Sequence, residues 1–170
     1  MMLAMVTATT VPIEVYLRSS YEPDAEYVDG VIEERPMGEL DHASWQLAIL
    51  AYFLRHSEWT VKALPELRVK VSPTRYRIPD VTVLKADAPR EQVITHAPLM
   101  VFEILSPEDT MKRILVKLAD YQQMGIEKIF VIDPGRNSYF YEAGNLEIVA
   151  GPMTVAHCRI DFVEIAALAS

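Results

Sequence analysis

Two apolar, strand-like segments each carry a carboxylate, and this feature restricts the chain more than any other. Asp80 lies in IPDVTVL (78–84), directly after Pro79, and Glu103 lies within LMVFEILSP (99–107). A buried carboxylate without a partner costs several kcal/mol, so each acid has to meet a cation or take up a proton. A fold that accepts this sequence therefore brings a cation to each of these acids or keeps the acid protonated.

Two explanations of these acids stay open on the two strands alone. The structural one is a buried salt bridge from each carboxylate to an arginine or lysine. The functional one is a divalent metal held by both carboxylates, with water and phosphate oxygens completing its ligand shell. An oxygen-only ligand set suits Mg²⁺, which keeps several of its waters in proteins.

A predicted helix after the second strand adds a lysine to the two acids. The segment EDTMKRILVKLADYQQMG (108–125) shows an apolar stripe when it is wound at about 100° per residue. Lys117 falls at the margin of this stripe, so its stem can lie on the core while its ammonium reaches the edge of the sheet. Beside a metal-bound phosphate, such an ammonium stabilises developing negative charge. The alternative is a surface lysine whose stem covers apolar side chains.

Further polar candidates lie nearer the N-terminus. Glu26 opens AEYVDGVIEER (25–35), whose Asp-Gly pair predicts a tight hairpin turn. Glu39, His42 and Gln46 recur at helical spacing and could bring Glu39 or His42 to a metal or to its water. A solvent-facing strip and a structural histidine explain the same pattern equally well. The single cysteine and the spacing of the other histidines argue against a zinc site.

The order of the segments predicts an α/β (α+β) fold, in which helices pack on a mixed β-sheet. Extended apolar runs predict strands at 25–35, 59–64, 67–72, 79–85, 99–106, 128–133, 138–143 and 146–150. Periodic apolar residues predict helices at 11–20, from about 39 to 56, 108–125 and 161–168. SPTRY (72–76) predicts a turn, and Gly125 predicts the end of the third helix.

The predicted helix from about 39 to 56 is apolar on nearly every side. One side consists of Leu40, Ala43, Leu47, Leu50 and Leu54, and the other of Trp45, Ile49, Tyr52 and Phe53. A helix of this kind is buried or covers a partner subunit. A homodimer or higher homo-oligomer is therefore one of two explanations of this apolar helix, and burial within a single chain is the other.

Length and charge bound the class of protein. A chain of 170 residues suits one domain (1–170), with residues 1–10 expected to be poorly ordered. Its apolar runs are shorter than the ~20 residues that a membrane helix needs, so no membrane partner is expected. With one cysteine, a cytoplasmic location is the default expectation. The net charge of −8 argues against a protein that merely coats nucleic acid.

One stretch departs from this acidic balance. Residues 62–85 are enriched in lysine and arginine and include Arg68, Arg75 and Arg77. Such a stretch can form a local basic surface for a polyanion, which makes these three arginines the candidate nucleic-acid contacts. Solvated strand ends explain the same residues about as well.

Taken in order, these motifs resemble those of a known family. AEYVDG, RIPDVTVL, PLMVFEILSPED and KLADYQQMGIEKIFVID closely resemble the Uma2 family. That family was long known as a domain of unknown function and is placed in the restriction-endonuclease-like PD-(D/E)xK superfamily. The resemblance covers about residues 12–168. It implies a central mixed sheet flanked by helices, an N-terminal helix and β-hairpin, and an acidic cluster at one edge of the sheet.

By position, the resemblance implies roles for individual residues. Asp80 corresponds to the aspartate of the PD motif and Glu103 to the acid of the (D/E)xK strand, and both are the implied metal ligands. The lysine expected two residues later is replaced by Leu105, and Lys117 on the next helix is the implied substitute. Glu26 matches a third acid of the catalytic set, although the aromatic residue that precedes it in the family is missing.

Three further residues match family positions and are expected to support the site: His42 at the start of the long helix, Ser106, and Tyr121, which could orient Lys117. The resemblance thus implies an endonuclease, dependent on Mg²⁺ or Mn²⁺, that hydrolyses phosphodiester bonds of nucleic acid, with DNA favoured. The alternative is a catalytically silent dimeric module that keeps the nuclease fold and binds nucleic acid or a protein partner. A third, weaker reading is a sugar hydrolase, whose two acids have to flank an open cleft.

Overall fold

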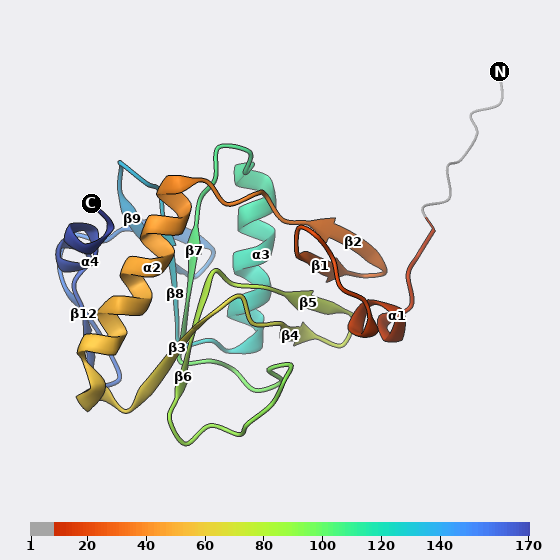
Figure 1. Ribbon diagram of the computed structural model, residues 1–170, viewed down its shortest axis with the longest axis horizontal. Helices are drawn as coiled ribbons and strands as arrows, with labels where there is room; N and C mark the ends of the chain where they lie inside the picture. The colour runs from red at the N-terminus through yellow and green to blue at the C-terminus, as the bar shows by residue number, and fades with distance from the viewer. Residues whose placement is uncertain (1–8) are drawn as a thin grey trace.

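The structure, a computed structural model, describes residues 9–170 and is organised around a six-stranded sheet (Figure 1). Its strands are β3 (Val61–Pro65), β6 (Val81–Lys85), β7 (Met100–Ile104), β8 (Lys128–Ile132), β9 (Ser138–Glu142) and β10 (Asn145–Ile148). Their order is β10-β9-β8-β7-β6-β3, with β7 and β8 parallel and the other neighbours antiparallel. The predicted mixed sheet is therefore confirmed. Of the segment expected to be poorly ordered, 1–10, all but the last two positions lie outside the described residues.

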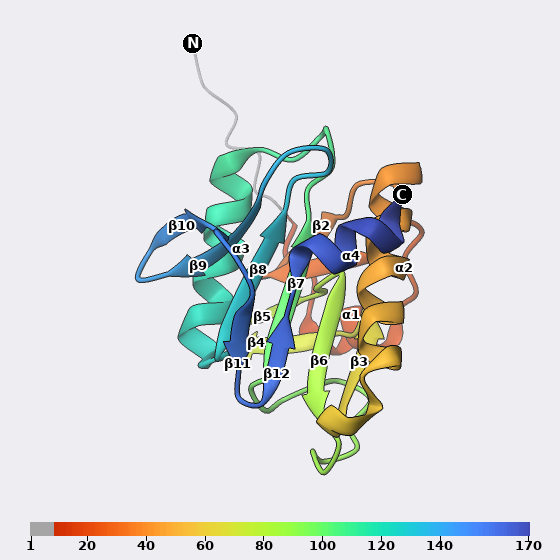
Figure 2. The ribbon, with the colours of Figure 1, turned by 90° about the vertical axis from the view of Figure 1, so that its left-hand side faces the viewer.

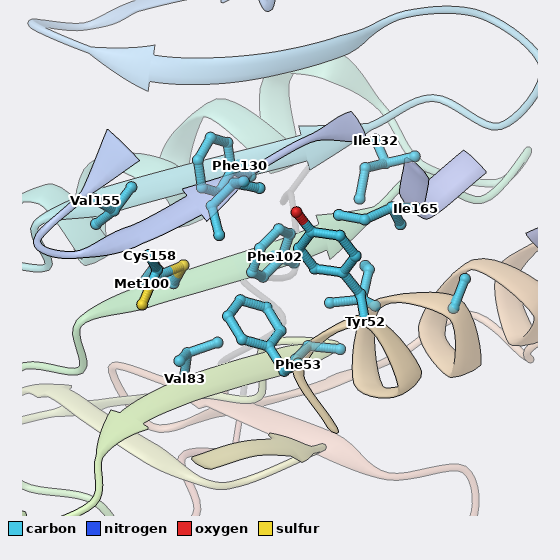
Figure 3. Close-up of a cluster of buried hydrophobic side chains, with 14 of the residues drawn as sticks. Tyr52, Phe53, Val83, Met100, Phe102, Phe130, Ile132, Val155, Cys158 and Ile165 are labelled. Atoms are coloured by element: carbon cyan, nitrogen blue, oxygen red, sulfur yellow. The ribbon is translucent and has the colours of Figure 1, made fainter. Parts of the chain in front are cut away.

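One face of this sheet is covered by α2 (Leu40–Arg55) and α4 (Phe162–Ala169), which pack against each other (Figure 2). Aromatic side chains fill the layer beneath them, where Phe102 stacks on Phe130 with ring centroids 5.0 Å apart (Figure 3). The hydroxyl of Tyr52 hydrogen-bonds to the backbone just before α4 and so ties the two helices together. No helix in the described part of the chain is long and apolar enough to span a membrane.

The opposite face of the sheet carries α3 (Met111–Met124), which connects the parallel strands β7 and β8. A parallel pair needs such a crossover, and a helix on the sheet face is its usual form. The helix begins where the Thr110 side chain accepts a hydrogen bond from the N–H of Arg113. It ends at Gly125, whose φ of 91° confirms the predicted C-cap. This placement turns the side chain of Lys117 towards the end of the sheet.

A second sheet stands beside the first. Its strands are β1 (Ala25–Val28), β2 (Val31–Glu34), β4 (Val69–Ser72) and β5 (Arg75–Arg77), in the order β2-β1-β5-β4. The predicted hairpin is confirmed, because Asp29 and Gly30 both have positive φ, as a two-residue turn requires. The short helix α1 (Ile13–Arg18) packs on this sheet through Tyr16, which is fully buried.

The shortest strands were predicted wrongly or missed. The turn predicted at 72–76 extends too far, because its last two residues, Arg75 and Tyr76, belong to strand β5. A separate hairpin, formed by β11 (Met153–Val155) and β12 (Cys158–Ile160), corresponds to no sequence pattern that we recognised. Each of these strands has three residues, which is too few to show a period of two.

Candidate active site

The predicted acids and the lysine converge on one small pocket at the end of the central sheet. Glu26 reaches it from β1, Asp80 from the residue before β6, Glu103 from β7 and Lys117 from α3. His42, in the first turn of α2, lines the pocket as well. The cavity has a volume of about 30 Å³, which is space for a few water-sized groups. Side chains from four elements, and from the residue that precedes β6, thus line one pocket.

Asp80 is held by three donors. The Arg35 guanidinium lies 2.6 Å from Oδ1, His42 Nε2 lies 3.1 Å from the same oxygen, and the N–H of Ile104 donates to Oδ2 at 2.7 Å. Burial opposes ionisation, but the His42 hydrogen bond and the charges of Lys117 and Arg35 lower the pKa of Asp80 below its ordinary value. The same hydrogen bond raises the pKa of His42. Asp80 is therefore a carboxylate at neutral pH.

Lys117 joins the other two acids. Its Nζ lies 2.8 Å from Glu26 Oε1 and 2.9 Å from Glu103 Oε2. The alternative of a surface lysine is wrong, because the side chain is buried and its ammonium pairs inside the pocket. Tyr121 donates its hydroxyl to Glu103 Oε1 at 2.5 Å. We had expected Tyr121 to orient Lys117, but its hydroxyl orients Glu103 instead.

Glu103 is the one acid of the three whose pKa is raised, whereas those of Asp80 and Glu26 are lowered. Burial raises the pKa of Glu103 to about 7, and the charges of Asp80 and Glu26 act in the same direction, while Lys117 opposes them. These acids also raise the pKa of Lys117, although its burial opposes the ammonium form. The pocket therefore holds a firmly protonated lysine beside a carboxyl group that titrates in the physiological range.

This raised pKa predicts a pH-dependent effect of Glu103→Gln on stability. A folded-state pKa of about 7 against 4.5 means that the contribution of Glu103 is fully present below pH 4.5 and is lost as the pH rises through 7. In the presence of a chelator, the variant should gain stability relative to the wild type by up to about 3 kcal/mol between pH 4.5 and pH 8. Chemical denaturation of both proteins across this range measures the difference, and a pH-independent difference would contradict the assignment.

A buried arginine holds the third acid in place. Arg77 is 1% exposed, and its guanidinium lies 3.0 Å from Glu26 and 2.7 Å from Asp120. The N–H of Ile78 adds a hydrogen bond to Glu26 at 2.9 Å. Although burial opposes it, the charges of Lys117 and Arg77 lower the pKa of Glu26. Glu26 is thus an ionised group fixed from two sides.

The three arginines expected to contact nucleic acid all have partners within the molecule. The burial of Arg77 leaves it no surface with which to contact a polyanion. Arg75 pairs with Asp29 and Asp120 at 2.7 Å each. Arg68 donates to backbone carbonyls at the end of α1 and lies over an aromatic ring. Carboxylates thus pair with Arg75 and Arg77 but not with Arg68, and the role of the basic stretch in binding nucleic acid stays a prediction.

Two other arginines, which the sequence analysis did not single out, lie at the pocket. Arg113 lines it together with Arg35, and both also line a shallower hollow beside it. Ser106 lies on the rim, where its N–H donates to Asp109 at 2.7 Å. The sequence held one sign that Arg35 could meet a buried acid: residues 1–42 are rich in acids and contain only two basic residues, of which Arg35 is one.

The sequence of this chain matches a family that fits the geometry of the pocket. Residues 13–144 match the family model of Uma2, which carries the description "Putative restriction endonuclease". The chain belongs to the Uma2 family. The matched range contains every predicted member of the Uma2 site, and the predicted resemblance is confirmed. No match was found among curated proteins.

One solved structure shares the architecture of this Uma2 chain over nearly its whole length. The chain is similar to the crystal structure of a "putative nuclease belonging to DUF820" from Anabaena variabilis, with a TM-score of 0.77 and 20% identity, over 92% of this chain and 97% of that one. This likeness confirms the predicted fold class. A DrdV–DNA complex solved by cryo-EM overlaps more weakly, with a TM-score of 0.43 and 19% identity, over 75% of this chain and 10% of that one.

The donors of this Uma2 pocket suit a hard divalent cation. A carboxylate can accept about four hydrogen bonds or metal contacts. Hydrogen-bond donors of the protein use only some of these positions on Asp80 and Glu103, so both carboxylates can also bind a metal. Oxygen donors of this kind fit Mg²⁺ or Mn²⁺. Within residues 9–170, no three His, Cys, Asp or Glu side chains form a ready-made ligand set. Water and substrate oxygens would therefore have to complete the ligand shell of a cation bound here.

Proposed function

We propose that this chain is a divalent-metal-dependent endonuclease that hydrolyses phosphodiester bonds of nucleic acid, with DNA as the favoured substrate. The observation that carries the proposal is the meeting of Asp80, Glu103 and Lys117 in one pocket, with Glu26 on the same ammonium. Lys117 alone faces two carboxylates, and a divalent cation would add the positive charge that gathers several acids in one pocket. Membership of the Uma2 family supports the same conclusion.

Each residue of the set has a distinct part in the proposed reaction. Asp80 and Glu103 would hold a divalent cation, which would supply the charge that polarises a phosphodiester and lowers the pKa of water. Lys117 has three N–H donors and uses two of them on Glu26 and Glu103, which leaves one for a phosphate oxygen. Negative charge that develops on that oxygen is stabilised by the ammonium. Tyr121 holds Glu103 in place through its hydroxyl.

Phosphate binding belongs to the rim of the pocket in this proposal. Arg35 and Arg113 line both the pocket and the shallower hollow next to it, so a phosphodiester that approaches the acids meets two guanidinium groups first. Arg35 pairs with Asp80, and a phosphate offers it an alternative anionic partner. In this proposal the nucleic-acid backbone is bound by Arg35 and Arg113 at the rim and not by residues 62–85, for which the sequence had suggested that role.

A cleavage assay tests the proposal. Purified protein is incubated with double-stranded DNA, single-stranded DNA and RNA in the presence of Mn²⁺, Mg²⁺ or a chelator. We expect cleavage with metal and none with chelator, and a loss of about 100-fold in rate for Lys117→Met. Lys112→Met, on the exposed side of the same helix, serves as the matched control and should retain full activity. Absence of cleavage on every substrate, or cleavage that persists in chelator, would refute the proposal.

The second candidate is the catalytically silent module. It is favoured by one observation: each carboxylate of the pocket is already paired with a protein cation, so the site is neutralised without a metal. The same assay separates the two, because a silent module retards nucleic acid on a gel without shortening it. The sugar-hydrolase reading has no such support, since Glu26, Asp80 and Glu103 are almost fully buried and paired with cations and do not flank an open cleft.

A further inference from the structure

Arg35 supplies positive charge to the candidate active site from within the chain. It lies between β2 and α2, in a segment that runs past the first turn of α3 (Figure 1). Its guanidinium lies 2.6 Å from Asp80 Oδ1, and its side chain is 11% exposed. Acids and protein cations are balanced around the pocket, where Glu26, Asp80 and Glu103 face Arg35, Arg77 and Lys117. A divalent cation added to this set leaves an excess of positive charge unless one protein cation moves away.

Of these three cations, Arg35 is the one that is placed to move. Lys117 is buried between two carboxylates, at 2.8 Å and 2.9 Å from their oxygens. Arg77 is 1% exposed and pairs with several acids. Arg35 lines the shallow hollow as well as the pocket, and Arg113 lines the same hollow. Arg35 therefore has space beside it in which its guanidinium can turn.

A second carboxylate lies on the outer side of Arg35. Arg35 Nη1 lies 3.6 Å from Glu66 Oε1, and the Glu66 side chain is 43% exposed. Glu66 has a φ of 53°, which residues other than glycine rarely adopt. Gln46 donates to Glu66 Oε1 at 3.5 Å and to the carbonyl oxygen of Asp80 at 2.9 Å, and so links the two acids. Arg35 can therefore leave the pocket without losing every anionic partner.

Asp80 does not depend on Arg35 for its position. His42 Nε2 lies 3.1 Å from Asp80 Oδ1, and the N–H of Ile104 donates to Oδ2 at 2.7 Å. If Arg35 turns away, these two donors still hold the carboxylate, and one more acceptor position opens on Oδ1. Asp80 then offers a cation more than it does when Arg35 is paired with it.

We propose that Arg35 couples metal binding to nucleic-acid binding. In the metal-free chain it pairs with Asp80, and when a divalent cation is bound it leaves Asp80 and binds a phosphate of the nucleic acid in the hollow beside Arg113. Glu66 is its partner outside the pocket until nucleic acid is bound. Each ligand then raises the affinity of the chain for the other by the same factor. This role rests on the proposed function and adds to it the residue that links the two ligands.

Calorimetric titration of the metal-free chain with Mn²⁺, without nucleic acid, tests the competition for Asp80. We expect Arg35→Met to lower the dissociation constant of Mn²⁺ by about 10-fold, because no guanidinium has to be displaced. Arg113→Met is the matched control, since it removes the same charge from the rim, but Arg113 pairs with Glu33 and the Glu34 carbonyl and not with Asp80. At about 0.15 M salt, its effect should stay within about twofold.

The outcomes separate this role from the metal site itself. Equal Mn²⁺ affinities of the wild type and Arg35→Met overturn the role of Arg35 and leave the metal site standing, as does an equal gain in both arginine variants. Absence of Mn²⁺ binding in both the wild type and Arg35→Met refutes the metal site, and the role of Arg35 with it.

A phosphorothioate DNA duplex, whose intact length is checked on a gel, tests the second half of the exchange. In chelator Arg35 stays with Asp80. Arg35→Met should then change the affinity for the duplex by less than about twofold, whereas with saturating Mn²⁺ it should weaken binding by about 10-fold. Fluorescence anisotropy measures both affinities. An equal loss with and without Mn²⁺ would show a phosphate contact that does not depend on the metal, and would overturn the coupling.

NMR of the ¹⁵N-labelled wild-type chain follows Arg35 without a substitution that disturbs the fold. The guanidinium signal of Arg35, assigned by its absence from Arg35→Lys, should shift when Mg²⁺ saturates the chain. The signal of Arg75, which pairs with Asp29 and Asp120 and does not line the pocket, should stay unchanged. An Arg35 signal that does not move at saturating Mg²⁺ overturns the exchange.

Discussion

Asp80→Asn and Glu103→Gln should each lower metal-dependent cleavage by about 1,000-fold or more, the amount that corresponds to several kcal/mol of lost metal and charge stabilisation. Both substitutions keep the size of the side chain, remove its negative charge and replace one acceptor oxygen with an amide nitrogen. Each side chain is buried in the pocket, so no neighbouring surface acid can take its place. Initial rates on a DNA substrate with Mn²⁺ measure the effect.

The matched control for this result is Glu147→Gln, the same chemical change at an exposed position on β10. It should cleave at the wild-type rate. Far-ultraviolet circular dichroism shows whether each variant is folded, so that lost activity is not confused with lost structure. Full cleavage by folded Asp80→Asn and Glu103→Gln would show that these carboxylates do not hold the metal.

Arg77→Met should destabilise the fold by about 3–5 kcal/mol. The arginine is buried between Glu26 and Asp120, and its removal leaves two buried carboxylates without one of their cations. Methionine keeps much of the apolar volume, so the loss reports the charge. Urea denaturation at pH 7 measures the free energy of unfolding.

An exposed arginine provides the comparison for Arg77. Arg159 pairs with Asp161 at 3.3 Å, but its side chain is mostly in water. Exposed ion pairs contribute about 0–1 kcal/mol, so Arg159→Met should change the free energy of unfolding by no more than that. Equal effects of the two substitutions would mean that the buried network around Glu26 is not a support of the site.

The sheet and its long helices could be predicted because their patterns are long. The segments 99–106 and 108–125 each run long enough to show a continuous apolar stretch or a helical stripe, and both are confirmed as β7 and α3. β5 and β11 could not be predicted, because three residues are held by pairing with their neighbours and not by their own pattern. Tertiary contacts decide such strands.

The members of the candidate site were predictable for a similar reason. Asp80 and Glu103 interrupt apolar segments, and a polar residue in an apolar segment is visible in the sequence. The cations that meet them were not equally visible. Arg35 contacts an acid 45 positions away, and Arg77 pairs with residues 43 and 51 positions away. Such pairs depend on how the hairpin and β5 pack against α3, which the local sequence does not reveal.

The central claim is that Asp80 and Glu103 together hold a divalent cation, and calorimetric titration with Mn²⁺ tests it most directly. The wild-type chain should bind one Mn²⁺ per protomer, with an affinity that falls as the pH drops below 7 and Glu103 takes up a proton. Asp80→Asn and Glu103→Gln should abolish this binding, while Glu147→Gln should not alter it. Mn²⁺ binding that survives either pocket substitution unchanged, or a folded wild-type chain that binds no Mn²⁺ at pH 8, would contradict the account.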